Sequence, residues 1–160
     1  MIKNIKKLTV KYNDRTVGIL AEVEEGKIAF QYDEKWVKNG FSISPISLPL
    51  NREVYVNRKD TFEGFYGVFH DSLPDGWGEL LVSRMLAAKQ GINYAELSPL
   101  TKLSIVSENG LGGLTYEPSQ TEKENVGYDL DALAKQAADV LDDGDINADL
   151  DTIYYLGGSS

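Results

Sequence analysis

The sequence of 160 residues lacks cysteine altogether and contains a single histidine, His70. Without cysteine, the chain can form neither a disulfide framework nor a reactive thiolate. His70 stands beside Asp71, and such a pair could act as a general base with an orienting carboxylate. No serine nucleophile or metal-ligand partner occurs at a useful spacing from it. We therefore expect His70 to pack at a helix entry or to lie on the surface, and we assign no catalytic residue.

Long apolar runs are also missing. No stretch of eighteen or more apolar residues occurs, so the sequence predicts no membrane-spanning helix. The first residues, MIKNIKKLTVKYN, lack the apolar segment of a secretory signal. These two absences favour a cytoplasmic protein. The 42% apolar and 26% charged residues are typical of a globular protein with a real core.

An excess of positive charge is the third absence. The formal net charge is −9, with a pI near 4.6. This balance disfavours direct binding to nucleic acid, which needs clustered lysine and arginine, and it disfavours anionic membrane surfaces. The charge is unevenly placed, because residues 1–11 carry four lysines and no acid whereas residues 117–151 are strongly acidic. A basic partner, or simple solubility, would fit the acidic end.

The first third of the chain shows the alternation typical of strands. Residues 8–12, 16–23 and 27–33 are rich in β-branched and aromatic residues and are separated by the short turns NDR and EEGK. They predict a three-stranded antiparallel meander. Residues 34–40 predict one helical turn that Gly40 ends. Pro45 and Pro49 make residues 42–50 an edge strand or an irregular extended segment.

The stretch from Phe69 to Gly91, FHDSLPDGWGELLVSRMLAAKQG, predicts a turn followed by a helix. Asp75 is the expected N-cap, Gly91 the left-handed stop, and the S-x-x-D pattern of Ser72 and Asp75 allows an earlier helical turn from Asp71. Trp77 is expected to anchor the helix to the sheet, within an apolar face formed by Trp77, Leu80, Leu81, Met85 and Ala88. We interpret this motif as structural rather than catalytic, and it consists of Asp71, Ser72, Leu73, Pro74, Asp75, Gly76, Trp77 and Gly78.

Two further helices and one strand complete the prediction. Residues 98–106 predict a short helix with Ser98 as cap and Pro99 in the first position. A strand at 114–118 and an amphipathic helix at 129–144 follow. The fold class expected is α+β, with an N-terminal antiparallel β subdomain (residues 1–56) followed by helices packed on a short second sheet element (residues 57–160).

Three glycine-containing segments invite a binding interpretation. Residues 142–151 fail the calcium-loop pattern, because alignment on Gly144 places Leu150 where the loop needs glutamate. The segment NGLGG (residues 109–113) is followed by a strand and not by a helix, so a tight turn is the better interpretation. At the end of the chain, Gly157, Gly158, Ser159 and Ser160 follow a β-like run, as in several phosphate-cradling loops. Taken alone, these four residues favour a flexible tail.

Several segments together resemble a known family. GVFHDSLPDGWGELLVSRML (residues 67–86) resembles the F-x-D-S-L-P-D-G-W-G-R-x-L segment in the N-terminal region of HipA-type proteins, which are serine/threonine kinases that act as toxins in bacterial toxin–antitoxin pairs. NGLGGLTYEP (residues 109–118) resembles the family's G-x-G-A-L-x-Y-x-P strand. Residues 16–36 and 46–50 are similar to its opening subdomain, and LGGSS resembles the start of its G-G-S-S-G-G-A-R-P-K loop.

The resemblance implies a role and its limits. In the family, the catalytic aspartate, the magnesium ligands and the ATP-anchoring lysine follow the glycine-rich loop, so this chain is expected to be an N-terminal portion without kinase activity of its own. The full-length protein would use ATP and Mg²⁺. Gly157 to Ser160 would begin the ATP loop, and Ser159 and Ser160 would be the candidates for autophosphorylation. No cofactor and no metal ligand is expected in this portion.

The resemblance also implies partners. These are a HipB-like helix-turn-helix antitoxin, through which contact with DNA would be indirect, and a protein substrate such as glutamyl-tRNA synthetase. An alternative class remains open, in which the chain is a stand-alone, non-enzymatic HipA N-terminal-like protein that binds and regulates a partner kinase. A reading frame that continues past Ser160 into a GGARPK-like sequence would favour the kinase interpretation.

Overall fold

Alternating apolar and polar residues near the N-terminus form three antiparallel strands. β1 spans Lys7–Tyr12, β2 spans Arg15–Glu24 and β3 spans Lys27–Tyr32. Asn13 and Asp14 make the two-residue turn between β1 and β2, and both have positive φ angles, 46° and 62°. This geometry matches the twist of a hairpin. The predicted meander is therefore confirmed.

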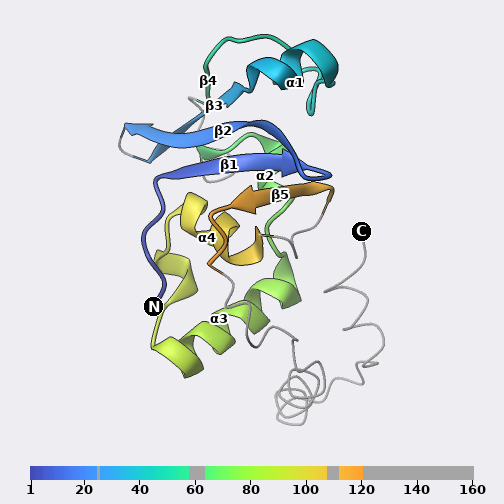
Figure 1. The fold of residues 1–160 in the computed structure, drawn as a ribbon. Coiled ribbons are helices and arrows are strands. Elements are labelled where there is room, and N and C mark those ends of the chain that lie inside the picture. Colours follow the sequence, from blue (N-terminus) through green and yellow to red (C-terminus); the bar gives the residue numbers. More distant parts are fainter. Residues whose placement is uncertain (25, 58–63, 108–111, 121–160) are drawn as a thin grey trace. The chain divides into compact units, whose positions relative to one another are not determined.

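The structure is a computed structural model (Figure 1), and it describes residues 1–24, 26–57, 64–107 and 112–120. The chain divides into two compact units. The first, called the sheet unit below, comprises Met1–Leu73 and Glu96–Gln120. The second comprises Pro74–Ala95 and Thr121–Ser160, of which Pro74–Ala95 is described. The predicted boundary between residues 56 and 57 stays a prediction.

One antiparallel sheet of five strands, in the order β4-β3-β2-β1-β5, is the framework of the sheet unit. The short β4, Tyr55–Val56, pairs with β3. At the other edge β5, Leu114–Glu117, runs antiparallel to β1 and places Tyr116 opposite Val10. The α+β class is confirmed. The strand that was expected to belong to a second sheet element lies instead in the same sheet, next to β1.

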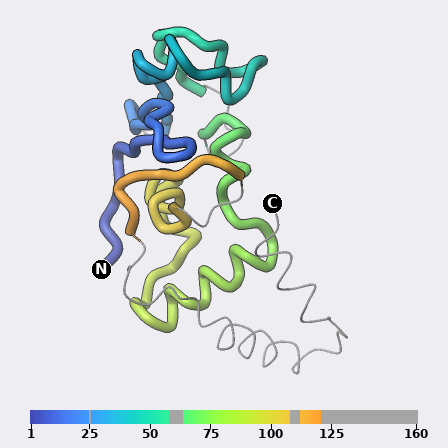
Figure 2. Tube along the Cα trace, turned by 45° about the vertical axis from the view of Figure 1, so that its right-hand side comes forward, coloured from blue at the N-terminus to red at the C-terminus, as the bar shows by residue number. Residues whose placement is uncertain are grey.

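Helices accompany the sheet, and two of them begin at side-chain caps. α1 spans Glu34–Asn39, and the carboxylate of its N-cap Asp33 accepts from the Lys35 N–H at 2.9 Å. α4 spans Pro99–Val106, and the Ser98 hydroxyl accepts from the Thr101 N–H at 3.3 Å, which confirms the predicted cap. α4 packs against β1, β2 and β5, and β5 (orange) crosses over α4 (yellow) in Figure 2.

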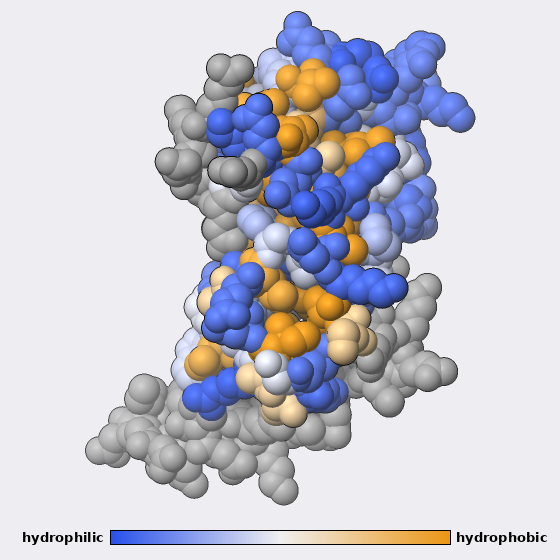
Figure 3. Space-filling model, turned by 90° about the vertical axis from the view of Figure 1, so that its left-hand side faces the viewer, coloured by the Kyte–Doolittle hydropathy of each residue, from blue (hydrophilic) through white to orange (hydrophobic). Residues whose placement is uncertain are grey.

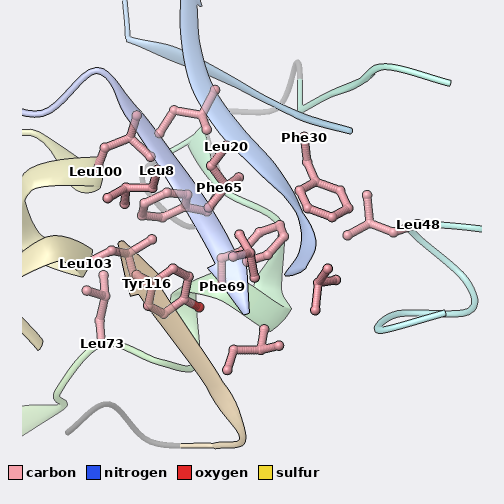
Figure 4. Packing of buried hydrophobic residues seen from close by; sticks show 14 of the residues in the cluster. Leu8, Leu20, Phe30, Leu48, Phe65, Phe69, Leu73, Leu100, Leu103 and Tyr116 are labelled. Atoms are coloured by element: carbon pink, nitrogen blue, oxygen red, sulfur yellow. The ribbon is translucent and has the colours of Figure 1, made fainter. Parts of the chain in front are cut away.

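The hydrophobic core of the sheet unit lies between the sheet and its helices. Leu8, Leu20 and Tyr116 project from the strands toward Leu100 and Leu103 of α4 (Figure 4). The short helix α2, Gly67–His70, contributes Phe69, whose ring centroid lies 5.0 Å from that of Phe30. The remaining members of the core cluster are Val10, Val17, Ile28, Tyr32, Trp36, Leu48, Phe65, Leu73, Val106 and Leu114.

Residues 42–50 form an irregular segment, as the two prolines predicted. A single bridge joins Ser44 to Leu48. The hydroxyl of Tyr32 donates to the Leu48 carbonyl at 2.8 Å, and the Ser42 hydroxyl donates to the same oxygen at 2.8 Å. Two side-chain hydroxyls therefore satisfy the Leu48 carbonyl in this segment, which forms no continuous sheet ladder.

In the second unit, α3 spans Gly76–Gln90 and ends at Gly91, whose φ of 64° confirms the predicted left-handed stop. The 3₁₀ turn η2, Tyr94–Glu96, follows, and its last residue already belongs to the sheet unit. Within the described ranges, none of the helices is long and apolar enough to cross a bilayer. The helix predicted at 129–144 and the acidic loop at 142–151 lie outside the described residues.

Candidate functional site

The predicted structural motif starts at the end of α2 and continues into the start of α3. Asp71 closes α2, and its N–H donates to the Gly67 carbonyl at 2.8 Å. The N–H groups of Ser72 and Leu73 donate to Phe69 and His70 at 3.0 Å, which extends the turn. The helical turn that Ser72 suggested thus precedes Asp71 instead of starting there.

Ser72 is the polar centre of the site. Its hydroxyl lies 2.6 Å from the hydroxyl of Tyr116 on β5, and the two residues are 2% and 0% exposed. Burial raises the pKa of Tyr116 well above its usual range, and the hydrogen bond with Ser72 opposes this shift only in part. Tyr116 is therefore neutral across the physiological range. Its hydroxyl joins the motif to the sheet.

Tyr116 is also held through its backbone. The hydroxyl of Ser107, which follows α4, donates to the Tyr116 carbonyl at 2.9 Å, and Ser107 is buried as well. A buried polar group is costly unless it is hydrogen-bonded. The Ser72 and Tyr116 hydroxyls satisfy each other, and the Ser107 hydroxyl satisfies the Tyr116 carbonyl. These bonds hold three chain segments together at Tyr116. The chemistry of this arrangement is structural, since no group in it is poised to exchange a proton near neutral pH.

The turn into α3 differs in detail from expectation. Asp75 occupies the N-cap position with extended backbone, but its side chain makes no capping hydrogen bond, so the predicted role of its carboxylate is wrong. Gly76 has a φ of 25°, and a Cβ at this position would meet no atom within 4 Å, so its positive φ is the reason that glycine occupies this position. A Cβ on Gly78 would lie 3.0 Å from the Cβ of Pro74. A close contact therefore accounts for Gly78, whereas a positive φ accounts for Gly76.

The predicted apolar face of α3 is not a buried face. Leu80 is 37% exposed and Ala88 is exposed, whereas Trp77 is only partly buried. The residue that α3 does bury is Leu86, which the predicted face did not include. The cause is visible in the sequence, because apolar residues at 80–82 and 85–86 spread around the helix and define no single stripe.

The other predicted site residues fall elsewhere. His70 is the last residue of α2 and is partly buried. Gly157, Gly158, Ser159 and Ser160, with the autophosphorylation candidates among them, lie outside the described residues. Within the described ranges, no group of three or more histidine or acidic side chains could hold a metal ion.

Two features escaped prediction. One is a hydroxyl stripe on α4 and its flanks, Ser98, Thr101, Ser104 and Ser107, which the three-residue spacing in SPLTKLSIVS could have revealed. The other is a cluster at the edge of the core, in which the exposed Arg15 guanidinium lies 4.8 Å from the ring centroid of the buried Trp36. Phe41, which is 49% exposed, lies 5.1 Å from the same ring. No sequence period signals such a cluster.

Apolar side chains reach the surface of the sheet unit in several places. The face shown in Figure 3 carries apolar residues among hydrophilic ones. The large exposed apolar residues of the sheet unit, apart from Met1, are Ile19, Val23, Phe41, Ile46 and Val54. Scattered exposure of this kind is normal for a globular protein. It gives surface for contacts.

The site and the fold define a class: an α+β module whose signature segment is bonded into the core of a five-stranded antiparallel sheet. The family model of the HipA N-terminal domain matches residues 8–117. The match begins at the second residue of β1 and ends at the last residue of β5, so it spans all five strands of the sheet. The chain therefore belongs to the HipA N-terminal domain family. Among curated proteins, none matches the sequence.

Proposed function

We propose that the chain is the N-terminal portion of a HipA-like serine/threonine kinase, the toxin of a bacterial type II toxin–antitoxin system. The observation that carries the proposal is the family match, which spans the five strands from β1 to β5. The Ser72–Tyr116 pair supports a scaffold role, because the most specific motif of the resemblance is used inside the core. In this role the chain holds a shape and offers surface to partners.

The chain has no kinase activity of its own under this proposal. Phosphoryl transfer depends on positioned charges and Mg²⁺ around the transferred group. In the family that the sequence resembles, these groups follow the glycine-rich loop, and Gly157 to Ser160 would only begin that loop. ATP and Mg²⁺ then belong to the full-length protein. Autophosphorylation at Ser159 or Ser160 would add about two negative charges, which oppose the phosphates of ATP in the same loop.

The partners proposed are a HipB-like helix-turn-helix antitoxin and, for the full kinase in the cytoplasm, a protein substrate such as glutamyl-tRNA synthetase. The net charge of −9 supports an indirect contact with DNA through the antitoxin. The exposed apolar residues, Phe41 among them, and the exposed Arg15 supply surface of the kind that protein partners use, since arginine and aromatic residues are enriched in interfaces.

A second candidate is a stand-alone protein that binds and regulates a partner kinase without catalysing a reaction. The observation in its favour is that the family match is to an N-terminal domain and ends at residue 117, well before Gly157. The two candidates share the scaffold and differ in the partner. The first expects an antitoxin as the main partner, and the second expects a separate kinase.

Two measurements test these candidates. The purified 160-residue chain, incubated with labelled ATP, Mg²⁺ and glutamyl-tRNA synthetase, should transfer no label, and ATP–Mg²⁺ should not raise its melting temperature. Affinity capture with the products of neighbouring genes should retain a helix-turn-helix protein for the first candidate and a kinase for the second. Robust labelling of a protein by the purified chain, with contaminants excluded, would overturn the scaffold role.

A further inference from the structure

The first six residues, Met1 to Lys6, are called the N-terminal strap below. They precede β1 and are held mainly by polar contacts. The Lys3 N–H donates to Oε1 of Gln120 at 2.6 Å, and Nε2 of Gln120 donates back to the Lys3 carbonyl at 2.8 Å. A side-chain amide that bonds both backbone groups of one residue imitates a neighbouring strand. One glutamine therefore pairs with the strap as a strand would.

The strap is bonded to the first two residues of the hydroxyl stripe, Ser98 and Thr101. Asn4 Oδ1 accepts from the hydroxyls of Ser98 and Thr101 at 3.0 and 3.2 Å. The Ile5 N–H donates to Oγ1 of Thr101 at 2.9 Å. Ile5 is the strap residue that packs against the core cluster, and it is only partly buried. Lifting the strap would thus expose mostly polar groups, which water can satisfy, so opening costs little compared with opening an apolar contact.

Gln120 joins the strap to α4 as well. Its Nε2 also donates to the Ser104 hydroxyl at 2.8 Å, and its backbone N–H donates to the Ser104 carbonyl at 2.9 Å. Ser104 is fully buried, whereas Gln120 is half-buried. Gln120 is also the point at which the chain leaves the sheet unit. In Figure 2 the blue N-terminal segment runs close to the orange segment that ends there.

We propose that the N-terminal strap is a clasp that opens as one unit and that its opening releases Gln120. The hinge lies at Lys6, whose carbonyl accepts from the Glu22 N–H at 2.9 Å, so the chain is fixed to the sheet from that residue onward. Because the shared hydrogen bonds form one network, the state of the strap and the state of the chain exit are coupled in both directions. A ligand or partner that captures the first residues would therefore loosen residue 120. This inference does not depend on the proposed kinase role.

Amide hydrogen exchange of the intact 160-residue chain, followed by NMR, tests the clasp. In Gln120→Ala the amides of both Lys3 and Ile5 should exchange roughly tenfold faster, although Ile5 does not bond Gln120, because loss of the glutamine opens the whole strap. In Thr101→Val the amide of Gln120 should exchange severalfold faster, although Thr101 does not bond it. Gln120→Glu, which keeps an acceptor for the Lys3 N–H, should give a smaller change.

Gln31→Ala is the matched control. Gln31 is a half-buried glutamine whose Nε2 donates to the Arg52 carbonyl at 2.8 Å in another part of the sheet unit. Its replacement should leave the Lys3, Ile5 and Gln120 amides unchanged. The proposal fails if Gln120→Ala accelerates Lys3 alone, because the strap would then not move as one unit. It also fails if all amides of the sheet unit accelerate together, because the strap would then open only on global unfolding.

Discussion

The sheet unit and helix α3 use apolar residues in different ways. In the sheet unit, side chains of period two on β1, β2 and β3 point into one core with α2 and α4, and most of them are almost fully buried. In α3, apolar residues surround the helix, and Leu86 is the residue that it buries. Stability should therefore be concentrated in the sheet unit, whereas α3 should tolerate substitution at most positions. Five experiments test this contrast.

The largest effect is expected for Phe69→Ala. Phe69 is fully buried and packs against Phe30, so truncation removes a large apolar group and leaves a cavity, at a cost of about 3–5 kcal/mol. Urea denaturation followed by tryptophan fluorescence or circular dichroism measures the loss. Ile46→Ala is the control within the same unit, because Ile46 is 97% exposed and should change stability by less than about 0.5 kcal/mol. Equal losses for the two variants would contradict the core described above.

A backbone clash should give the next largest effect. A Cβ on Gly18 in β2 would collide with the Gln31 carbonyl oxygen of β3 and would lie 2.7 Å from the Phe30 ring. Gly18→Ala should cost about 1–3 kcal/mol, because two paired strands must move apart. Gly76→Ala at the start of α3 meets no atom within 4 Å and should cost about 1 kcal/mol, through its positive φ alone. A larger loss for Gly76→Ala would reverse the ranking of the two regions.

Loss of the Ser72–Tyr116 hydrogen bond should lower the free energy of unfolding by less than Phe69→Ala or Gly18→Ala. Tyr116→Phe leaves the buried Ser72 hydroxyl without its partner and should cost about 1–2 kcal/mol. Because Ser72→Ala removes the same bond, the double variant should lose less than the sum of the two single losses. Tyr12→Phe, at a partly buried tyrosine of β1, is the control and should be nearly neutral. Strict additivity of the two substitutions would show that the hydroxyls do not interact.

The same tyrosine predicts a dependence on alkaline pH. Burial raises the folded-state pKa of Tyr116, whereas the unfolded tyrosine titrates near its ordinary value of about 10. The unfolded state therefore loses its proton first, so this contribution to stability is fully present below about pH 10 and is lost as the pH rises toward the folded pKa. Denaturation between pH 8 and 11 should show a falling free energy of unfolding. Tyr116→Phe should reduce the slope, while the raised pKa values of Tyr55 and Tyr66 retain part of it.

The sequence predicted the elements whose signals are local. The meander followed from alternation and short turns, α4 from Ser98 and Pro99, and the end of α3 from Gly91. The position of β5 beside β1 could not be predicted, because no local pattern specifies a partner about a hundred residues away. The contact of Ser72 with Tyr116 could not be predicted for the same reason, because no local pattern links the two segments, although the sequence singled out each of them.

The errors in α3 have a different origin. Asp75 does occupy the predicted N-cap position. The direction of its side chain depends on the turn geometry that Pro74 and Gly76 impose, and the sequence pattern does not specify it. The apolar face was chosen by spacing alone, and a helix with apolar residues on several sides offers more than one such choice. The hydroxyl stripe of α4 was readable as a spacing, yet its meaning depends on the N-terminal strap and Gln120, which come from opposite ends of the described chain.

The smallest effect is expected for Leu80→Ala in α3. Leu80 is 37% exposed, and alanine favours the helix at least as well as leucine, so the free energy of unfolding should change by less than about 0.5 kcal/mol. Leu86→Ala, six residues further along the same helix, should cost about 2–3 kcal/mol, because Leu86 is 3% exposed. Thermal unfolding followed by far-ultraviolet circular dichroism compares them in one helix. If the two leucines proved equally costly, α3 would bury the face that spacing predicts, and the contrast with the sheet unit would disappear.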